Sequence, residues 1–192
     1  MTRVLKFGGT SVGSPESLAN AVEVIRKRAA HGPVVVVVSA LSGVTSALDA
    51  AAASGDPSIV DSLRDRHTLL LHELTSASWN GSGRTVDALF AALTHALALR
   101  PESSTPEHDL VLGIGERLAA PLVTEVLRHR GIDATAIDAT DVVRTDGMWG
   151  EARVDFVATR ARLLQRLASV RGVPVITGYV GATAAGVPTT VP

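Results

Sequence analysis

An unbroken run of five valines, Val34–Val38, most constrains how this chain can fold. β-Branched side chains favour extended backbone, and a strand that is apolar at every position has to be covered on both faces. Such strands are typical of parallel sheets with helices on both sides. The valine run is also the longest apolar stretch of the chain, and it is far too short to cross a bilayer.

The rest of the chain alternates short apolar segments with longer segments of helical periodicity. Further strands are expected at residues 4–7, 131–138 and 173–178, with only a weak strand signal in the turn-rich stretch 142–150. Helices are expected over residues 17–30, from the end of the 39–43 segment to residue 53, and from residue 58 past Leu74. Three more are expected over residues 85–99, after a Gly-Ile-Gly-Glu turn at 113–116, and over residues 157–170. Ala185-Gly186 suggests a hairpin-like turn near the end. This alternation predicts an α/β domain, a three-layer αβα arrangement with a largely parallel sheet and right-handed crossovers.

Length and composition set the class of protein. The 192 residues suit one domain or one lobe of a larger enzyme, and 46% hydrophobic residues with a mean hydropathy of +0.26 can supply a sizeable core. Intrinsic disorder is therefore not expected. A net charge of −1 argues against a general nucleic-acid or membrane-surface binder.

The chain contains no cysteine, which rules out a disulfide framework, a thiol nucleophile and a thiolate metal site. The first residues show no secretory signal, and a cytoplasmic location is expected. Lys6 and Lys27 are the two lysines, while the other 16 cationic residues are arginines. Any chemistry that needs an ammonium group therefore has few candidates.

Ligands of open parallel sheets collect where the strands end, and three predicted strand or turn ends combine small and polar residues. The first is Lys6-Phe-Gly-Gly-Thr-Ser11. Two adjacent glycines allow a ligand to approach the backbone, successive N–H groups can hold an anion, and the lysine can neutralise phosphate oxygens. An ordinary Gly-Gly turn before a capped helix explains the same residues about equally well.

The second end, Ser39-Ala-Leu-Ser-Gly-Val-Thr45, follows the valine strand with hydroxyl groups that suit an anionic ligand. Simple helix capping by Ser42 or Thr45 is the alternative. The third is Gly113-Ile-Gly-Glu-Arg117, where Glu116 is expected in the first turn of a helix. There its carboxylate either interacts favourably with the helix dipole or binds a substrate ammonium group. In the second case the neighbouring glycines would leave room for the ligand.

Several common catalytic motifs are absent from the sequence. There is no Walker A loop, no His-Glu-x-x-His pair, no Gly-x-Ser-x-Gly elbow and no dense cluster of His, Asp and Glu at metal-ligand spacing. The six histidines are scattered, and most are expected at the surface or at helix ends. No metal-ligating residue is assigned.

Taken together and in this order, the three segments resemble the aspartokinase branch of the amino acid kinase family. Lys6–Ser11, Val36–Thr45 and Gly115–Leu118 are similar to three successive family motifs. Further matches follow in the expected order at Thr145-Asp146, Ala152–Asp155 and Thr177–Thr183. The resemblance covers nearly the whole chain, and it implies the substrate-binding N-terminal lobe of the amino acid kinase fold.

The resemblance also implies a reaction and a set of roles. The γ-phosphoryl group of ATP, with Mg²⁺, would move to the side-chain carboxylate of L-aspartate or a similar amino acid. Lys6, Gly8 and Gly9 would contact the transferring phosphoryl group, with Thr10 and Ser11 beside them. Ser39 and Thr45 would bind the aspartate carboxylate, Glu116 would take the α-ammonium group, and Tyr179 would line the pocket where the family usually has phenylalanine.

The family's pattern continues beyond Gly186–Pro192 into a Gly-Arg-Gly-Gly-Ser-Asp segment, a nucleotide-binding lobe and regulatory ACT domains. Residues 1–192 are therefore expected to form a single domain that lacks these parts, does not hold ATP alone and is inactive alone. Three hypotheses remain open: a piece of an aspartokinase, a non-catalytic amino-acid-binding or regulatory module that pairs with a partner, and an enzyme remodelled for other chemistry. An exposed sheet edge predicts association, either as a homo-oligomer or with a partner that supplies the C-terminal lobe.

Overall fold

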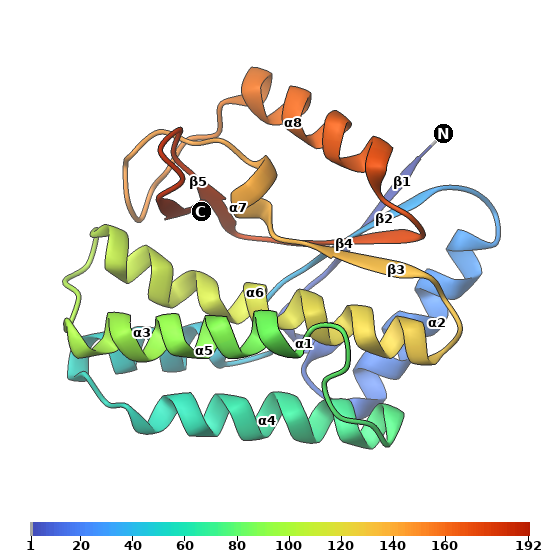
Figure 1. Cartoon of the computed structure of the whole chain (residues 1–192), viewed down its shortest axis with the longest axis horizontal. Helices are drawn as coiled ribbons and strands as arrows, with labels where there is room; N and C mark the ends of the chain where they lie inside the picture. Colours follow the sequence, from blue (N-terminus) through green and yellow to red (C-terminus); the bar gives the residue numbers. More distant parts are fainter. Residues whose placement is uncertain (1) are drawn as a thin grey trace.

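Figure 1 shows the chain as a computed structural model, which describes residues 2–192. The valine run forms β2 (Val34–Val38) inside a sheet of order β1-β2-β4-β3. The other strands are β1 (Arg3–Phe7), β3 (Ala134–Ile137) and β4 (Val173–Thr177). Every neighbouring pair is parallel, which confirms the expected sheet with the valine strand at an interior position.

The strand register brings three chain segments to one edge of the sheet. Phe7 pairs with Val38, and Val38 pairs with Thr177. The residues that follow β1, β2 and β4 therefore leave the sheet side by side. The Ser39 amide donates to the Phe7 carbonyl (3.0 Å), and the Gly178 amide donates to the Val38 carbonyl (2.8 Å). Hydrogen bonds between neighbouring segments therefore continue beyond the ends of the strands.

Helices cover both faces of the sheet, as predicted. Figure 1 shows α8 on one side together with the short α7, and α2 to α6 on the other side, with α4 farthest from the sheet. α6 is the central helix of the thicker side, because it contacts the sheet as well as α3, α4 and α5. The helices are α1 (Gly9–Val12), α2 (Pro15–Ala29), α3 (Val44–Ser54), α4 (Ser58–Thr75), α5 (Gly83–Ala98), α6 (Pro106–His129), α7 (Ala139–Val142) and α8 (Phe156–Ser169).

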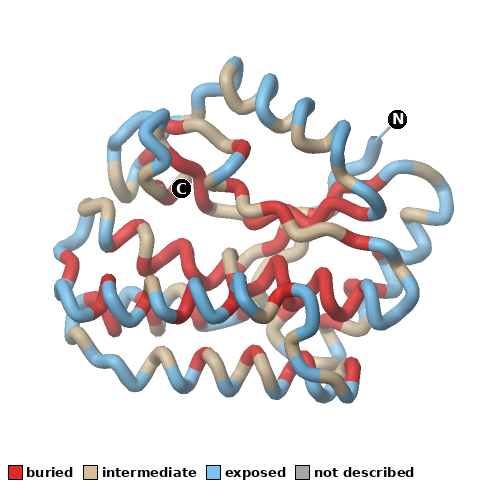
Figure 2. The backbone as a smooth tube through the Cα atoms, viewed as in Figure 1, coloured by how far each residue is buried: buried red, intermediate tan, exposed pale blue. Residues whose placement is uncertain are grey.

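The two sides of the sheet differ in how much they bury. The larger core lies on the α6 side, where Leu118, Leu122 and Phe90 are almost completely buried. The smaller one packs Val35, Ile137 and Ile176 against partly buried leucines of α8. α8 itself has no buried residue, and Figure 2 shows it as alternating exposed and intermediate positions.

α6 corrects one expectation from the sequence. The Gly-Ile-Gly-Glu stretch is not a turn that begins a helix, because the helix already starts at Pro106 with the Thr105 hydroxyl as its cap. The two glycines lie inside α6, where they allow close packing. A Cβ on Gly113 would come 2.7 Å from Cγ1 of Val180, and one on Gly115 would come 2.7 Å from Cβ of Ala40.

The last part of the chain forms a small second sheet. β5 (Val180–Ala182) pairs antiparallel with β6 (Pro188–Thr190) around the predicted turn, in which Gly186 has φ of 82°. The weak strand signal at 142–150 begins where α7 ends, at Val142, and corresponds only to isolated bridges made by Arg144 and Thr145.

Five of the six histidines lie at the surface or at a helix end, as expected for most of them, and His67 is the exception. His67 is fully buried in the middle of α4 and His108 is 8% exposed in the first turn of α6, whereas the other four are exposed. Burial lowers the pKa of His67 to about 4, so its ring is neutral near pH 7. Within residues 2–192, no helix is both long enough and apolar enough to cross a membrane.

Candidate functional site

A cavity of about 580 Å³ opens where β1 and β2 end, between α3, α6 and the segment that follows β4. Seven residues line it: Lys6, Ser39, Thr45, Glu116, Tyr179, Val191 and Pro192. The structure thus brings together five residues that were selected from three separate motifs and the segment after β4. The sequence carries no local signal for Val191 and Pro192, which reach the cavity because the β5–β6 hairpin returns to it.

Lys6 supplies the positive charge of the cavity. It lies on β1 opposite Val37, with its side chain on the exposed part of the strand end. Gly8 follows at the N-cap of α1, and a Cβ built on it would meet nothing within 4 Å. Open space beside a cation is what an anionic group requires for close approach to the backbone.

Gly9 has a different explanation from Gly8. A Cβ there would lie 2.6 Å from the Ala40 carbonyl oxygen, and the Ser42 amide donates to the Gly9 carbonyl (3.2 Å). Gly9 therefore allows the loops after β1 and β2 to touch. Gly8, Gly9, Thr10 and Ser11 lie next to Lys6 along the chain but are not among the residues that line the cavity.

Ser39 and Thr45 bring hydroxyl groups to the cavity from the two ends of one short connection. Ser39 follows β2 directly, and Thr45 is the second residue of α3. Gly43 between them has φ of 80°, a left-handed conformation that turns the chain into the helix and that glycine adopts without a Cβ clash. Both hydroxyls are half-buried, which leaves them accessible to a ligand in the cavity.

Glu116 is the most unusual residue of the site. It is only 4% exposed, and its Oε2 atom is buried without a hydrogen-bond partner. Desolvation raises the pKa of this carboxyl to about 7, although the amides of Ala40 and Glu116 and the charge of Lys6 act in the opposite direction. An unpaired buried acceptor costs free energy, and a cationic donor in the cavity would remove that cost.

The position of Glu116 depends on the glycines before it. Gly115 allows α6 to touch Ala40 and Val44, and Gly113 allows it to touch Val180. These glycines make room for protein packing, which corrects the expectation that they leave space for a ligand. Their effect is to bring a mid-helix carboxylate close to the end of β2.

Tyr179 forms a wall of the cavity in a strained backbone conformation. Its φ of 62° is left-handed, which is uncommon for a residue with a Cβ. The Val191 amide donates to the Tyr179 carbonyl (2.8 Å), so two wall residues are bonded to each other. Burial raises the pKa of the Tyr179 phenol above its ordinary value, and the phenol is therefore neutral near pH 7.

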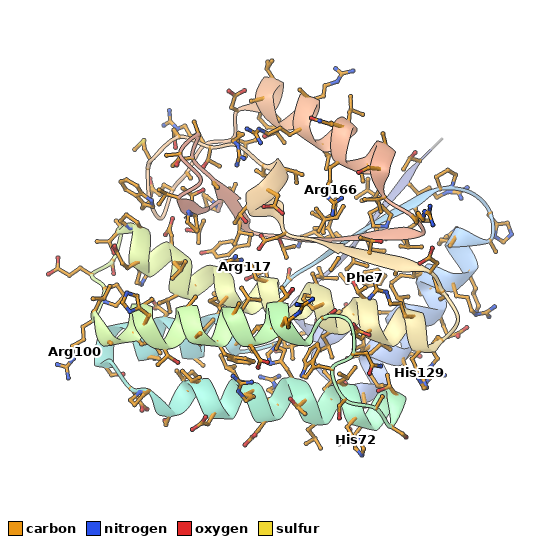
Figure 3. All side chains as sticks on the ribbon, in the orientation of Figure 1. Phe7, His72, Arg100, Arg117, His129 and Arg166 are labelled. Atoms are coloured by element: carbon orange, nitrogen blue, oxygen red, sulfur yellow. The ribbon has the colours of Figure 1, made fainter. Side chains whose placement is uncertain are left out.

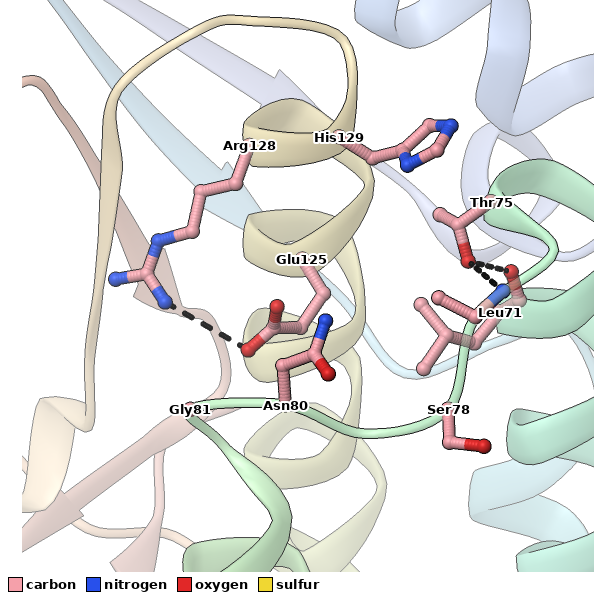
Figure 4. Close-up of a pocket in the computed structure, with 9 residues that line it drawn as sticks. Leu71, Thr75, Ser78, Asn80, Gly81, Glu125, Arg128 and His129 are labelled. Atoms are coloured by element: carbon pink, nitrogen blue, oxygen red, sulfur yellow. Dashed lines mark hydrogen bonds and ion pairs between the residues drawn. The ribbon is translucent and has the colours of Figure 1, made fainter.

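A second cavity lies at the other end of α6, and Figure 4 shows its lining. It measures about 340 Å³, and its two charged side chains that form ion pairs or hydrogen bonds, Glu125 and Arg128, already have protein partners. Glu125 accepts hydrogen bonds from the amide (3.1 Å) and hydroxyl (2.7 Å) of Ser82, and Arg128 donates to the Ala134 carbonyl (2.9 Å). These contacts hold the α4–α5 connection against α6.

Arg117, next to Glu116, has a structural partner of its own. Its side chain leaves α6 toward the end of β3 (Figure 3), and its Nε donates to Oδ2 of Asp138 at 2.6 Å. Among residues 2–192, no three His, Asp or Glu side chains come together in a way that could hold a metal ion.

Comparisons with known proteins place these observations in a family. The Amino acid kinase family profile matches residues 1–190. The aspartokinase of Chlamydia muridarum is 30% identical over 97% of this chain. The crystal structure of Escherichia coli aspartokinase III in complex with aspartate and ADP superposes with a TM-score of 0.86 at 27% identity over 100% of this chain. The lysine and aspartate complex of the same enzyme gives 0.85 over 99% of this chain.

These relatives are considerably longer than residues 1–192. The chain spans 41% of the Chlamydia muridarum relative and 43% of either Escherichia coli structure. The matching fold, the parallel sheet and the profile match over almost every residue agree with one another. The chain belongs to the amino acid kinase family.

Proposed function

We propose that the cavity binds L-aspartate and that this chain is the acceptor-binding part of an aspartate kinase. The observation that carries the proposal is the buried Oε2 atom of Glu116, which has no partner in a cavity that also contains a lysine and two hydroxyls. A ligand with one ammonium and two carboxylate groups complements that set. Aspartate is the smallest standard amino acid of this kind, and the Escherichia coli enzyme was crystallised with it.

Each group then has one task. Glu116 accepts hydrogen bonds from the ligand's α-ammonium group, which supplies the missing partner. Ser39 and Thr45 donate their hydroxyls to the side-chain carboxylate and orient it. Tyr179 and Val191 cover the ligand on the opposite side and keep water away. Positioning of this kind accounts for much of the rate of a phosphoryl transfer.

Lys6 prepares the transfer itself. Its side chain lines the cavity at the exposed end of β1, two residues before Gly8, where open space lets a phosphoryl group approach the backbone. An aspartate carboxylate oxygen attacks the γ-phosphorus of ATP, the bond to the ADP oxygen breaks, and aspartyl phosphate and ADP result. Lys6 stabilises the negative charge on the transferring group.

We propose that residues outside this span make most of the nucleotide contacts. The chain spans well under half of the relatives' length, and the polar groups of the cavity are already assigned to the amino acid and the transferring phosphoryl group. The Mg²⁺ ion that the family resemblance implies finds no set of three protein ligands within residues 2–192, so no step is assigned to it. The 192 residues alone are expected to bind aspartate without turning it over.

Calorimetry on the 192-residue chain tests the proposal. L-Aspartate should bind, whereas succinate, which lacks the ammonium group, and L-asparagine, which lacks the side-chain charge, should bind at least about tenfold more weakly. Equal affinity for succinate would contradict the role of Glu116. No heat with L-aspartate at millimolar concentration would contradict the proposed function.

A pair of variants on the same helix makes the test specific. Glu116→Gln should abolish aspartate binding, because the amide cannot balance an ammonium charge. Glu125→Gln is the matched control, since Glu125 is also a buried carboxyl of α6 but belongs to the second cavity. It should leave aspartate affinity unchanged. MgATP added to the chain should show whether nucleotide binding needs more than these residues.

A further inference from the structure

Asp109 is a fully buried carboxylate that neither the sequence motifs nor the proposed function assigns. It lies in the first turn of α6 and is 0% exposed. None of the ion pairs within residues 2–192 includes it. Burying a carboxylate without a cation costs free energy unless hydrogen bonds satisfy its oxygens. The hydrogen-bond donors of Asp109 therefore show which segments it holds in place.

Those partners come from two distant parts of the chain. Oδ2 of Asp109 accepts from the amide of Thr190 (2.7 Å) and from the amide of Gly150 (3.0 Å), while Oδ1 accepts from the Thr190 hydroxyl (3.0 Å). The carboxylate therefore fastens β6 and the 146–151 loop to the start of α6. Thr190 is also fully buried, which means that water cannot replace the bond.

The bonds continue from Asp109 to the wall of the candidate site. Thr190 is followed by Val191, whose amide donates to the Tyr179 carbonyl, and Val191 and Tyr179 both line the cavity. Tyr179 has a left-handed φ, a conformation that persists only when its surroundings hold it. Glu116 comes seven positions after Asp109, so the two lie on nearly the same face of α6, within about 20° of each other.

We propose that Asp109 is a positioning residue of the amino-acid site: by holding Thr190 it fixes Val191 and Tyr179 as the wall that faces Glu116. One helix then carries both the carboxylate that meets the ligand and the carboxylate that keeps the opposite wall in place. The effect on ligand affinity rests on the proposed function, whereas the effect on the wall does not.

Two substitutions separate positioning from general stability. Asp109→Ala removes all three bonds and leaves the buried Thr190 amide and the partly buried Gly150 amide without partners, so the wall should loosen. Asp109→Asn is the conservative variant, because its oxygen can accept from both amides while its NH₂ group donates to the Thr190 hydroxyl. Asp49→Asn is the control, since Asp49 bonds to His108 in the same turn of α6 (3.0 Å) and none of the side-chain hydrogen bonds within residues 2–192 joins it to β6.

The first measurement is amide hydrogen exchange on the 192-residue chain without ligand. Asp109→Ala should speed exchange at Val191, whose amide is the link to Tyr179, by about tenfold or more, and Asp109→Asn and Asp49→Asn should not. Unchanged exchange at Val191 in a folded Asp109→Ala variant would overturn the proposal. If that variant does not fold, Thr190→Val replaces it. It removes the hydroxyl bond but keeps both amide bonds to Asp109, so it should speed the same amide by a smaller factor.

The second measurement is the dissociation constant for L-aspartate of each folded variant, beside its melting temperature. Asp109→Ala should weaken binding by about tenfold, Asp109→Asn should recover most of the affinity, and Asp49→Asn should equal the parent chain. A lower melting temperature with unchanged affinity would show a purely structural role and overturn the proposal. Absence of aspartate binding by the parent chain would refute the proposed function instead, and the exchange data would then decide whether Asp109 holds the wall.

Discussion

At the residue scale, the buried carboxyl of Glu116 should make the folded chain less stable near neutral pH. Its carboxyl is buried, one oxygen has no partner, and the pKa is raised to about 7 by desolvation. An acid whose folded pKa exceeds its unfolded value binds more protons in the native state. The native state is therefore stabilised by protonation at low pH and loses that contribution as the pH rises.

Stability should show this directly. The free energy of unfolding should fall between pH 4.5 and about 7, by roughly 3 kcal/mol for a shift from 4.5 to about 7 at 1.36 kcal/mol per pKa unit. Glu116→Gln removes the titrating group, so the variant should not lose this stability as the pH rises. Relative to the parent chain, the free energy of unfolding of the variant should therefore increase by about that amount from pH 4.5 to pH 8. Urea denaturation at both pH values measures it, and a pH-independent difference would contradict the assignment.

Aspartate binding should have the opposite pH dependence. Only the ionised Glu116 can pair with an ammonium group, so affinity for L-aspartate should rise between pH 6 and pH 8, by up to about tenfold per pH unit below the pKa. At pH 6 binding should release a proton, which calorimetry in two buffers of different ionisation enthalpy detects. The Glu125→Gln control should keep this profile, and equal affinity at both pH values would contradict it.

At the scale of elements, the site depends on how closely three chain segments approach one another. α6 touches the loop after β2 because Gly115 has no Cβ, and the loop after β1 touches the same loop because Gly9 has none. Two of the glycines that look like ligand contacts in the sequence are therefore packing contacts. Gly8 differs from them, because nothing in the protein fills the space beside it.

Two alanine substitutions should separate these roles. Gly9→Ala places a Cβ 2.6 Å from the Ala40 carbonyl oxygen and should destabilise the chain by about 1–3 kcal/mol, as overpacking does. Gly8→Ala meets no atom within 4 Å at a φ of −77° and should change stability by less than about 0.5 kcal/mol. Thermal or urea unfolding measures both, and a similar loss in the two variants would contradict the distinction.

At the scale of the whole molecule, the sheet is covered unevenly. Within residues 2–192, β1 pairs with β2 alone, so its other edge is free, and Val4 on it is 67% exposed. On the same side of the sheet, α8 exposes Phe156 (79%) and Val157 (83%). Open strand edges and exposed apolar side chains favour association.

Sedimentation should therefore show association of the 192-residue chain at tens of micromolar. Val4→Arg, which puts a charge on the open edge, should shift the equilibrium toward monomer. Leu99→Arg is the control, since Leu99 is similarly exposed (56%) at the end of α5, away from this edge. A stable monomer at several hundred micromolar would contradict the prediction.

Local patterns were sufficient for most of the fold, and the family resemblance supplied five of the seven residues that line the candidate site. The valine run predicted a strand covered on both faces, and periodicity located α2, α3, α5 and α8 to within a few residues. Both signals are local, because side-chain shape and apolar spacing act within one element. Lys6, Ser39, Thr45, Glu116 and Tyr179 were selected from motif order, and all five line one cavity.

Contacts between distant segments decided the rest. Gly113 and Gly115 are turn residues by local propensity, yet they lie inside α6, because packing against Val180, Ala40 and Val44 outweighs a propensity cost of about 1 kcal/mol per glycine. The position of Val191 at the cavity and the bond between Asp109 and Thr190 join residues that lie far apart in the chain. The sequence by itself determined which elements form and which polar groups stand at their ends. Only the tertiary structure decided that a buried carboxylate lies without a partner in a shared cavity, because burial is a property of the packed chain.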